Sequence, residues 1–183
     1  MMEKRHTVRK YLDKPLDMDL IGLLNDRIER NNCVYNLTFK LITNNSDGLS
    51  SLARLMSNNS VQNYIILAGK DNSDLDKKIG YCGADLILYA QSLGLNTWWC
   101  GGMFNGKNAL KHLDNKAVRV NGVIAIGYGK TQGVPHKSKT ADQVSHYKGD
   151  APEWFTSGIK ALLLAPSALN RQPYICLLYT SPS

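Results

Sequence analysis

The sequence lacks the short motifs that mark several common classes of site. Its four cysteines form no Cys-x-x-Cys pair and have no histidine at metal-ligand spacing, so neither a zinc site nor a redox disulfide is indicated. No Gly-x-Gly-x-x-Gly stretch stands between a strand and a helix, which excludes the usual dinucleotide fingerprint. His112 and His146 have no Ser, Cys or carboxylate partner at a recognisable spacing, and we expect them at the surface or at helix ends.

Long apolar runs and blocks of like charge are also missing. No run approaches the roughly 18 apolar residues of a membrane span, and residues 1–7 are charged where a signal peptide needs an apolar core. We therefore expect a soluble, cytoplasmic protein without a membrane partner. The 22 Lys and Arg give a net charge of +7, which favours anionic partners. These cations form no block of five or more and lack interleaved aromatic residues, which argues against nucleic-acid binding.

The apolar pattern that is present predicts mixed helices and strands in one domain of 183 residues. The predicted helices cover residues 17–29, 49–56, 74–93, 107–113 and 151–164, and the predicted strands cover residues 37–41, 64–69, 95–99, 123–127 and 174–178. The continuous apolar run 64–69 is typical of a central strand whose two faces are covered by helices.

Local signals give expected helix ends. Asp17 and Asp150 are the expected N-caps of the first and last helices, and Glu153 is placed to complete a capping box in the last one. The pair Asn31-Asn32 is the expected end of the first helix. Gly94 is the expected left-handed residue after the helix 74–93.

A dense group of hydrogen-bonding side chains lies near the end of the chain, in residues 165–173. Ser167, Asn170 and Gln172 stand between two prolines there, directly after a predicted helix. Such a group suits the wall of a ligand site. An ordinary helix-ending turn has a similar composition, and this stretch alone leaves both interpretations open.

Two basic clusters are candidates for holding a phosphate. Arg5 and Arg9 lie at i and i+4 with His6 and Thr7 between them, so a short turn would aim two guanidinium groups and a hydroxyl at one phosphate. Residues 136–139 add a second cluster after the end of a predicted strand, where loops often build sites. A merely solvated basic terminus is the alternative for the first cluster.

The order helix, loop, strand occurs twice, in residues 17–41 and again in residues 150–178. Two related halves about a pseudo-twofold axis would produce this order. Coincidence between two common units is the other interpretation, because the side chains of the two segments hardly match.

Four segments in order resemble the FMN-dependent nitroreductase family. They are KRHTVRKY at 4–11, GYCGADLILYAQSLGL at 80–95, GGMF at 101–104 and APSALNRQP at 165–173. The resemblance runs from about residue 4 to residue 174. It implies an α+β fold with a mixed, mostly antiparallel sheet flanked by helices, and FMN held between two subunits or two similar halves. The protein is then a homodimer or a pseudo-dimeric monomer.

The resemblance also implies which residues bind FMN. Arg5, His6, Thr7 and Arg9 would hold the phosphate and ribityl chain, with Lys137 and Lys139 adding positive charge; Gly101 and Gly102 would let the backbone approach the flavin edge; Pro166, Ser167 and Asn170 would line the ring, with Gln172 close by.

The implied activity is that of an FMN-dependent NAD(P)H oxidoreductase. NADH or NADPH would reduce FMN, and a nitroaromatic, quinone or similar small molecule would then accept the electrons. No catalytic side chain and no metal is expected, because the cofactor carries the hydride. An FMN-binding protein without turnover and a basic nucleic-acid-binding domain are the alternative functions.

Three residues beside the Gly101-Gly102 turn have expected positions. The neighbours Trp98 and Trp99 point to opposite faces of a strand, so at most one of them would wall a ligand. Cys100 is expected to be a small buried residue rather than a reactive thiol.

The sequence departs from the family pattern in two places. In most of the family the Pro-Ser-x-x-Asn-x-Gln-Pro motif follows the first helix, but residues 29–33 lack it and the motif lies in the C-terminal half. This position resembles a variant branch with two related halves. The chain also stops where the family would continue, so we expect a nitroreductase-like FMN-binding domain at 1–174 and an atypical or truncated tail at 175–183.

Overall fold

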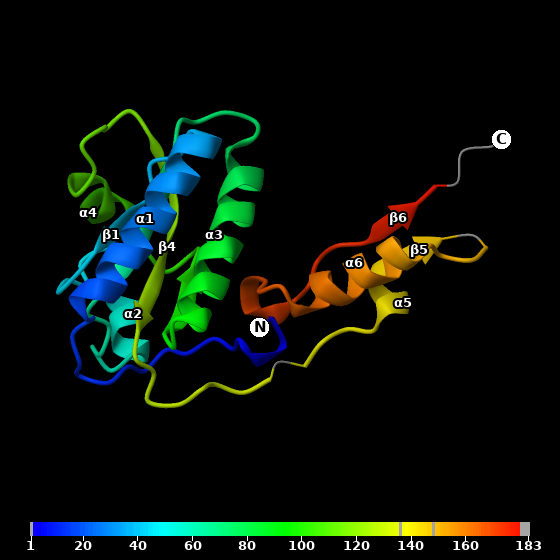
Figure 1. The fold of residues 1–183 in the computed structure, drawn as a ribbon, viewed down its shortest axis with the longest axis horizontal. Helices are drawn as coiled ribbons and strands as arrows, with labels where there is room; N and C mark the ends of the chain where they lie inside the picture. The colour runs from blue at the N-terminus through cyan, green and yellow to red at the C-terminus, as the bar shows by residue number, and fades with distance from the viewer. Residues whose placement is uncertain (1, 136, 148, 180–183) are drawn as a thin grey trace. The chain divides into compact units, whose positions relative to one another are not determined.

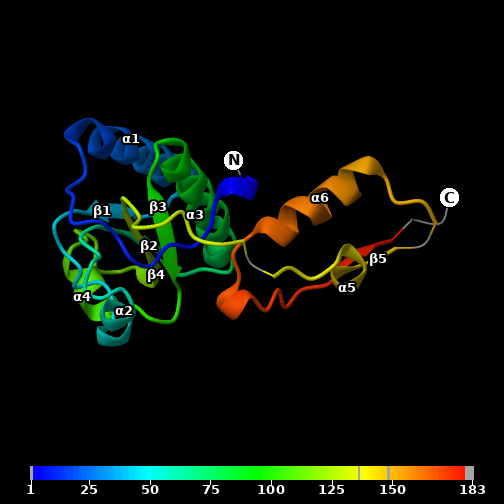
Figure 2. The ribbon, with the colours of Figure 1, turned by 90° about the horizontal axis from the view of Figure 1, so that it is seen from below.

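The computed structural model describes residues 2–135, 137–147 and 149–179 (Figures 1 and 2). The chain divides into two compact units. The N-terminal unit comprises Arg5–Val134, and the C-terminal unit comprises Met2–Lys4 and Pro135–Ser183.

A four-stranded sheet organises the N-terminal unit. Its strands are β1 (Lys40–Ile42), β2 (Tyr64–Gly69), β3 (Asn96–Cys100) and β4 (Arg119–Gly127). They lie in the order β1-β2-β4-β3, and every neighbouring pair is antiparallel. The helices are α1 (Met18–Tyr35), α2 (Ser51–Met56), α3 (Leu75–Ser92) and α4 (Gly106–Lys111). The predicted α+β class with a mostly antiparallel sheet is confirmed.

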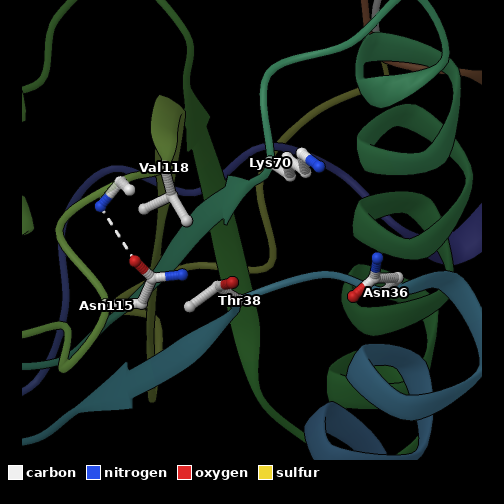
Figure 3. A pocket seen from close by; sticks show the side chains of 6 residues that line it. Asn36, Thr38, Lys70, Asn115 and Val118 are labelled. Atoms are coloured by element: carbon white, nitrogen blue, oxygen red, sulfur yellow. Dashed lines mark hydrogen bonds between the residues drawn. The ribbon is translucent and has the colours of Figure 1, made fainter.

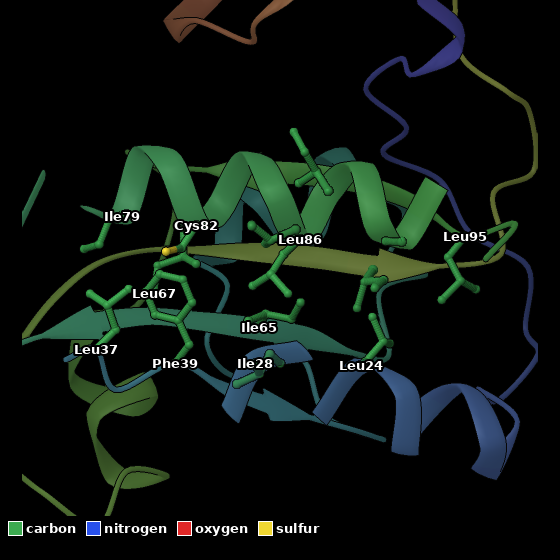
Figure 4. Close-up of a cluster of buried hydrophobic side chains, with 14 of the residues drawn as sticks. Leu24, Ile28, Leu37, Phe39, Ile65, Leu67, Ile79, Cys82, Leu86 and Leu95 are labelled. Atoms are coloured by element: carbon green, nitrogen blue, oxygen red, sulfur yellow. The ribbon is translucent and has the colours of Figure 1, made fainter. Parts of the chain in front are cut away.

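Helices cover both faces of this sheet because the strand side chains alternate between two apolar clusters. Ile65 and Leu67 of β2 pack with buried residues of α1 and α3, as the close-up in Figure 4 shows. Tyr64 and Ile66 face the other way, toward α2 and α4. All six residues of β2 are buried. The predicted central strand with helices on both faces is therefore confirmed.

The C-terminal unit is built from shorter elements. They are η1 (Met2–Lys4), α5 (Ala141–Val144), β5 (Ser145–Tyr147), α6 (Glu153–Leu164), η2 (Ala168–Asn170) and β6 (Cys176–Leu178). Strands β5 and β6 are parallel, and a small core forms around Val144, Phe155 and Ile159. Helix α6 and strand β6 are joined by a loop, as α1 and β1 are. That these two segments belong to related halves stays a prediction. Within the described part of the chain, no helix combines the length and apolarity that a membrane span requires.

The predicted end of α1 at Asn31-Asn32 is wrong, since the helix continues to Tyr35. The Asn31 side chain donates to the Asp85 carboxylate at 3.0 Å, and the Asn32 side chain donates to the Phe39 carbonyl at 2.9 Å. Because distant partners satisfy these amides, they do not compete for the helical backbone. The helix ends instead at Asn36, whose φ of 53° is left-handed.

Asp17 is the N-cap residue of α1 as predicted, whereas Asp150 is not the N-cap of α6. Asp17 stands at the start of α1 without a side-chain cap bond, and its carboxylate accepts a hydrogen bond from the Tyr128 hydroxyl at 2.7 Å. Helix α6 begins only at Glu153, so the Asp150 cap and the capping box are wrong. Pro152 is extended at ψ 151°, and a residue that precedes proline avoids the helical region, which keeps Ala151 out of the helix.

An ion pair joins α1 to α3. The Arg27 guanidinium donates to both oxygens of Asp85, with Nε 2.8 Å from Oδ2. The Asp85 side chain is 22% exposed. The hydrogen bonds from Arg27, and secondarily from Asn31, outweigh burial and lower the pKa of this carboxyl below its ordinary value. A lowered pKa stabilises the fold above the unfolded-state pKa, and this contribution is lost as the pH falls through the folded-state pKa.

We expect Asp85→Asn to lower the free energy of unfolding by about 1 kcal/mol at neutral pH. Wild type loses stability as the pH falls below the unfolded-state pKa of about 4 and through the lower folded-state pKa of Asp85, and the variant loses less over the same range. Urea unfolding at a series of pH values measures both effects. Asp26→Asn, which alters an exposed carboxylate on α1 next to Arg27, is the control. Parallel pH curves for wild type and Asp85→Asn would contradict the stabilising role.

Candidate functional site

The first basic cluster lies along β3, the edge strand of the sheet. Thr7 pairs in parallel with Thr97, and the Val8 N–H donates to the Thr97 carbonyl at 3.1 Å. The segment is therefore extended, and the short turn predicted from the sequence is wrong. In an extended chain alternate residues share a side, so we expect Arg5, Thr7 and Arg9 to project on the same side.

The loop after β4 fixes this segment in place. Asn96, which is 2% exposed, accepts from the Gly129 N–H at 3.0 Å and donates to the Gln132 side chain at 3.2 Å. Gly133 has a φ of 75°, and a Cβ there would lie 2.7 Å from the Cβ of His6. The basic segment is thus held by the edge strand β3 and by the loop that follows β4.

Arg5 is a buried cation. It is 7% exposed, and burial lowers the pKa of its guanidinium. Among the described residues no Asp or Glu forms an ion pair with it. Arg9 is exposed and its guanidinium carbon lies 5.5 Å from the centre of the Trp98 ring. Because a buried charge without a counter-ion is costly, Arg5 fits a site for an anionic ligand.

Gly101 and Gly102 follow β3 directly, and both are exposed. A Cβ at Gly102 would meet nothing within 4 Å, and one at Gly101 would touch only Trp99 at 3.9 Å. Neither glycine has a positive φ. The packing and backbone of this chain do not require glycine at either position, so the open space fits close approach of a ligand.

The three residues beside this turn lie as the sequence predicts. Trp98 belongs to the cluster under α2 and α4, and Trp99 packs on the opposite side against α3. Cys100 is 1% exposed, and burial raises the pKa of its thiol to about 12. A thiol of such a high pKa stays protonated and unreactive at neutral pH.

The second set of predicted residues comes together within the C-terminal unit. The Asn170 side chain donates to the Lys137 carbonyl at 2.7 Å, and the Lys139 ammonium donates to the Gln172 carbonyl at 2.9 Å. The Ser167 hydroxyl accepts from the Gln172 N–H at 3.0 Å. These residues belong to two segments that are separate in the sequence, and the fold brings both into one hydrogen-bonded loop.

Gln172 lies inside this loop rather than on its surface. It is fully buried, and its amide oxygen accepts from the Lys139 N–H at 2.8 Å. Its amide nitrogen donates to the Leu163 carbonyl at 2.9 Å. Pro166 is exposed, while Ser167 and Asn170 are half-buried. Of the predicted ring-lining residues, these three have accessible surface, and Gln172 has none.

The predicted site residues thus form two groups, one in each unit. Arg5, His6, Thr7, Arg9, Gly101 and Gly102 belong to the N-terminal unit, and Lys137, Lys139, Pro166, Ser167, Asn170 and Gln172 belong to the C-terminal unit.

One polar cluster has no counterpart in the sequence predictions. The His112 Nε2 atom lies 2.9 Å from the Asp47 carboxylate, which also accepts from the Tyr64 hydroxyl at 2.7 Å. Burial raises the pKa of Asp47, but the hydrogen bonds from Tyr64 and His112 outweigh it and lower the pKa overall. His112 follows the end of α4 as expected, and its carboxylate partner is one that no recognisable sequence spacing indicates. No short spacing signals this pair, because 65 residues separate its members.

A shallow polar pocket of about 300 Å³ lies elsewhere in the N-terminal unit (Figure 3). Its lining residues are Asn36, Thr38, Lys70, Asn115, Ala117 and Val118. None of the residues predicted to bind FMN lines this pocket.

The family match spans almost the whole chain. A family model described as "Putative TM nitroreductase" matches residues 1–181. No curated protein matches the sequence significantly.

Solved structures from several bacteria share the fold. A "putative nitroreductase" of Thermotoga maritima is 19% identical with a TM-score of 0.66, covering 97% of this chain and 70% of that one. A "putative nitroreductase in complex with FMN" from Desulfovibrio desulfuricans is 16% identical with a TM-score of 0.62, covering 81% and 94%. An "FMN-dependent nitroreductase" of Clostridium difficile is 15% identical with a TM-score of 0.59, covering 81% and 98%.

Proposed function

The chain belongs to this nitroreductase family, and from that premise we propose that it is an FMN-dependent NAD(P)H oxidoreductase. The proposed acceptors are nitroaromatic compounds, quinones or similar small molecules. Two structural neighbours whose names include FMN support the choice of cofactor. We further propose a cytoplasmic protein that acts as a homodimer or a pseudo-dimeric monomer.

The observation that carries the proposal is Arg5, a cationic residue that is only 7% exposed. It has no carboxylate partner among the described residues, and it lies on an extended segment that also carries Thr7 and Arg9. Two guanidinium groups and a hydroxyl on one side of a strand-like segment suit a phosphate, since charge-assisted hydrogen bonds are the stronger ones. The residues present therefore fit the phosphate end of FMN.

The proposed roles of the chain's own residues follow from these positions. Arg5 and Arg9 would bind the phosphate, while Thr7 would donate to it or to the ribityl chain. His6 is half-buried beside Gly133 and would shape the same end of the site. Gly101 and Gly102 would leave room for the ring edge. When bound, FMN supplies the hydride-transfer chemistry, so no side chain has to act as acid, base or nucleophile.

The loop of the C-terminal unit supplies the second group of proposed contacts. Pro166 would offer an apolar surface to the flavin ring, and the Ser167 hydroxyl and the Asn170 side-chain oxygen would bind its polar edge. Lys137 would add positive charge that favours an anionic ligand. The proposal for this group rests on the resemblance and on the accessible surface of these residues.

Oxidation of NADH and NADPH in the presence of a nitroaromatic or a quinone tests this function. We expect oxidation that requires both added FMN and the protein. Binding of FMN without any oxidation would favour a flavin-storing protein. Salt-dependent binding to DNA or RNA together with indifference to FMN would favour a nucleic-acid-binding domain and contradict the proposal.

A further inference from the structure

The loop between α6 and β6 holds an unusual backbone conformation. Leu169, Asn170 and Gln172 have φ values of 51°, 54° and 45°. Asparagine enters the left-handed region readily, but leucine and glutamine do so at a cost in free energy. A stretch with three such residues persists only where its surroundings compensate for that cost.

Gln172 and Lys139 provide the compensation. The Gln172 side chain bridges the Lys139 N–H and the Leu163 carbonyl at the end of α6. The backbone of Gln172 is held at both polar atoms, since its N–H donates to Ser167 and its carbonyl accepts from the Lys139 ammonium. All four bonds lie within the C-terminal unit, and Gln172 is fully buried.

The held conformation presents two side chains at the tip of the loop. Leu169 is 84% exposed, which is unusual for a leucine in a strained backbone. Asn170 is tied through its nitrogen to the Lys137 carbonyl, and this bond fixes the direction of its oxygen. The loop therefore displays an apolar group and a hydrogen-bond acceptor in fixed positions.

We propose that Gln172 and Lys139 are positioning residues that clasp residues 166–171, so that Leu169 and Asn170 are preorganised to contact the isoalloxazine ring. This inference rests on the proposed function. It assigns Gln172 and Lys139 an indirect role, acting on the ligand only through the loop they hold. Preorganisation raises affinity because the loop need not be ordered when the ligand binds.

Gln172→Met tests the clasp, because it keeps the side-chain volume and removes both amide hydrogen bonds. We expect the dissociation constant for FMN to rise about tenfold, the visible absorption band of bound FMN to change shape, and limited proteolysis to cut within residues 165–173. Tyr174→Phe is the matched control. It removes the hydrogen bond from the Tyr174 hydroxyl to the Leu162 carbonyl at 3.0 Å and the contact of that hydroxyl with the Gln172 side chain, but it keeps all four bonds of Gln172 described above.

A second substitution tests the strain itself. Asparagine adopts the left-handed region at lower cost than leucine, so Leu169→Asn is expected to raise the thermal unfolding midpoint of wild type. The same change should give no gain in the Gln172→Met background, because an unclasped loop has already released the strain.

Two results overturn the inference. One is a Gln172→Met protein whose FMN affinity, spectrum and proteolysis match those of Tyr174→Phe. The other is an equal gain from Leu169→Asn in both backgrounds. If wild type binds no FMN, the proposed function fails, while proteolysis and the Leu169→Asn comparison still decide whether the clasp exists.

Discussion

Replacing Arg5 with methionine is expected to raise the dissociation constant for FMN by about 100-fold. Hydrogen bonds from a charged group to a ligand are worth about 1.5–3 kcal/mol, and 1.4 kcal/mol corresponds to tenfold. The same substitution should not destabilise the ligand-free protein, and its unfolding midpoint should rise, because a buried cation without a counter-ion is replaced by an apolar side chain. Fluorescence titration with FMN and thermal unfolding measure the two effects.

Lys10→Met is the matched control for Arg5. Lys10 is exposed, lies on the same segment, and carries the same charge, so its loss changes the net charge equally. We expect less than a threefold change in FMN affinity, a size that screening of an exposed charge allows. If Arg5→Met and Lys10→Met weaken FMN binding alike, Arg5 acts through general charge and the phosphate assignment is wrong.

Gly83→Ala is expected to destabilise the protein by about 1–3 kcal/mol, the usual cost of overpacking a core. A Cβ at this position of α3 would overlap the ring of Trp99, which therefore has to move. Because the Trp99 ring has to move, we also expect a change in tryptophan fluorescence. Chemical denaturation and emission spectra of the variant measure these effects.

We expect Gly80→Ala, on the same helix, to stabilise the protein instead. A Cβ there meets nothing within 4 Å, so the variant gains only the better helix propensity of alanine, about 0.5–1 kcal/mol. Stabilisation by both substitutions would show that Trp99 does not pack closely on Gly83.

Those parts of the fold that depend on local apolar pattern could be predicted from the sequence. Strand β2 is a continuous apolar run, and α3 repeats apolar residues at helical spacing up to the left-handed Gly94. Short elements carried no such signal. Helix α5 and strand β5 have four and three residues, too few for a period to be recognised.

Errors in the predicted helix ends have a common physical cause. Asn31 and Asn32 are of a residue type that is common at helix ends, but their side-chain amides donate to Asp85 and to Phe39. Asp17 is of a residue type that often caps a helix with its side chain, but its carboxylate accepts a hydrogen bond from Tyr128 and makes no cap bond. A side chain that finds a distant partner no longer acts on its own backbone, and a local pattern does not contain that partner.

The same limit applies to the candidate site. The residues of each basic or polar segment could be recognised in the sequence, since each segment is continuous. That Gln172 holds Lys139, and that Asp47 meets His112, depends on chain folding across 33 and 65 residues. The sequence therefore indicates candidate ligand contacts, but it does not indicate the residues that hold their side chains and backbone in place.

FMN binding and reduction are both visible in the absorption spectrum of the protein mixed with FMN, recorded without oxygen before and after NADH or NADPH is added. We expect the flavin band to shift on binding and then to disappear when the reduced nicotinamide cofactor is added, much faster than for free FMN. A flavin band identical to that of free FMN, or one that the nicotinamide leaves unchanged, would contradict the proposed function.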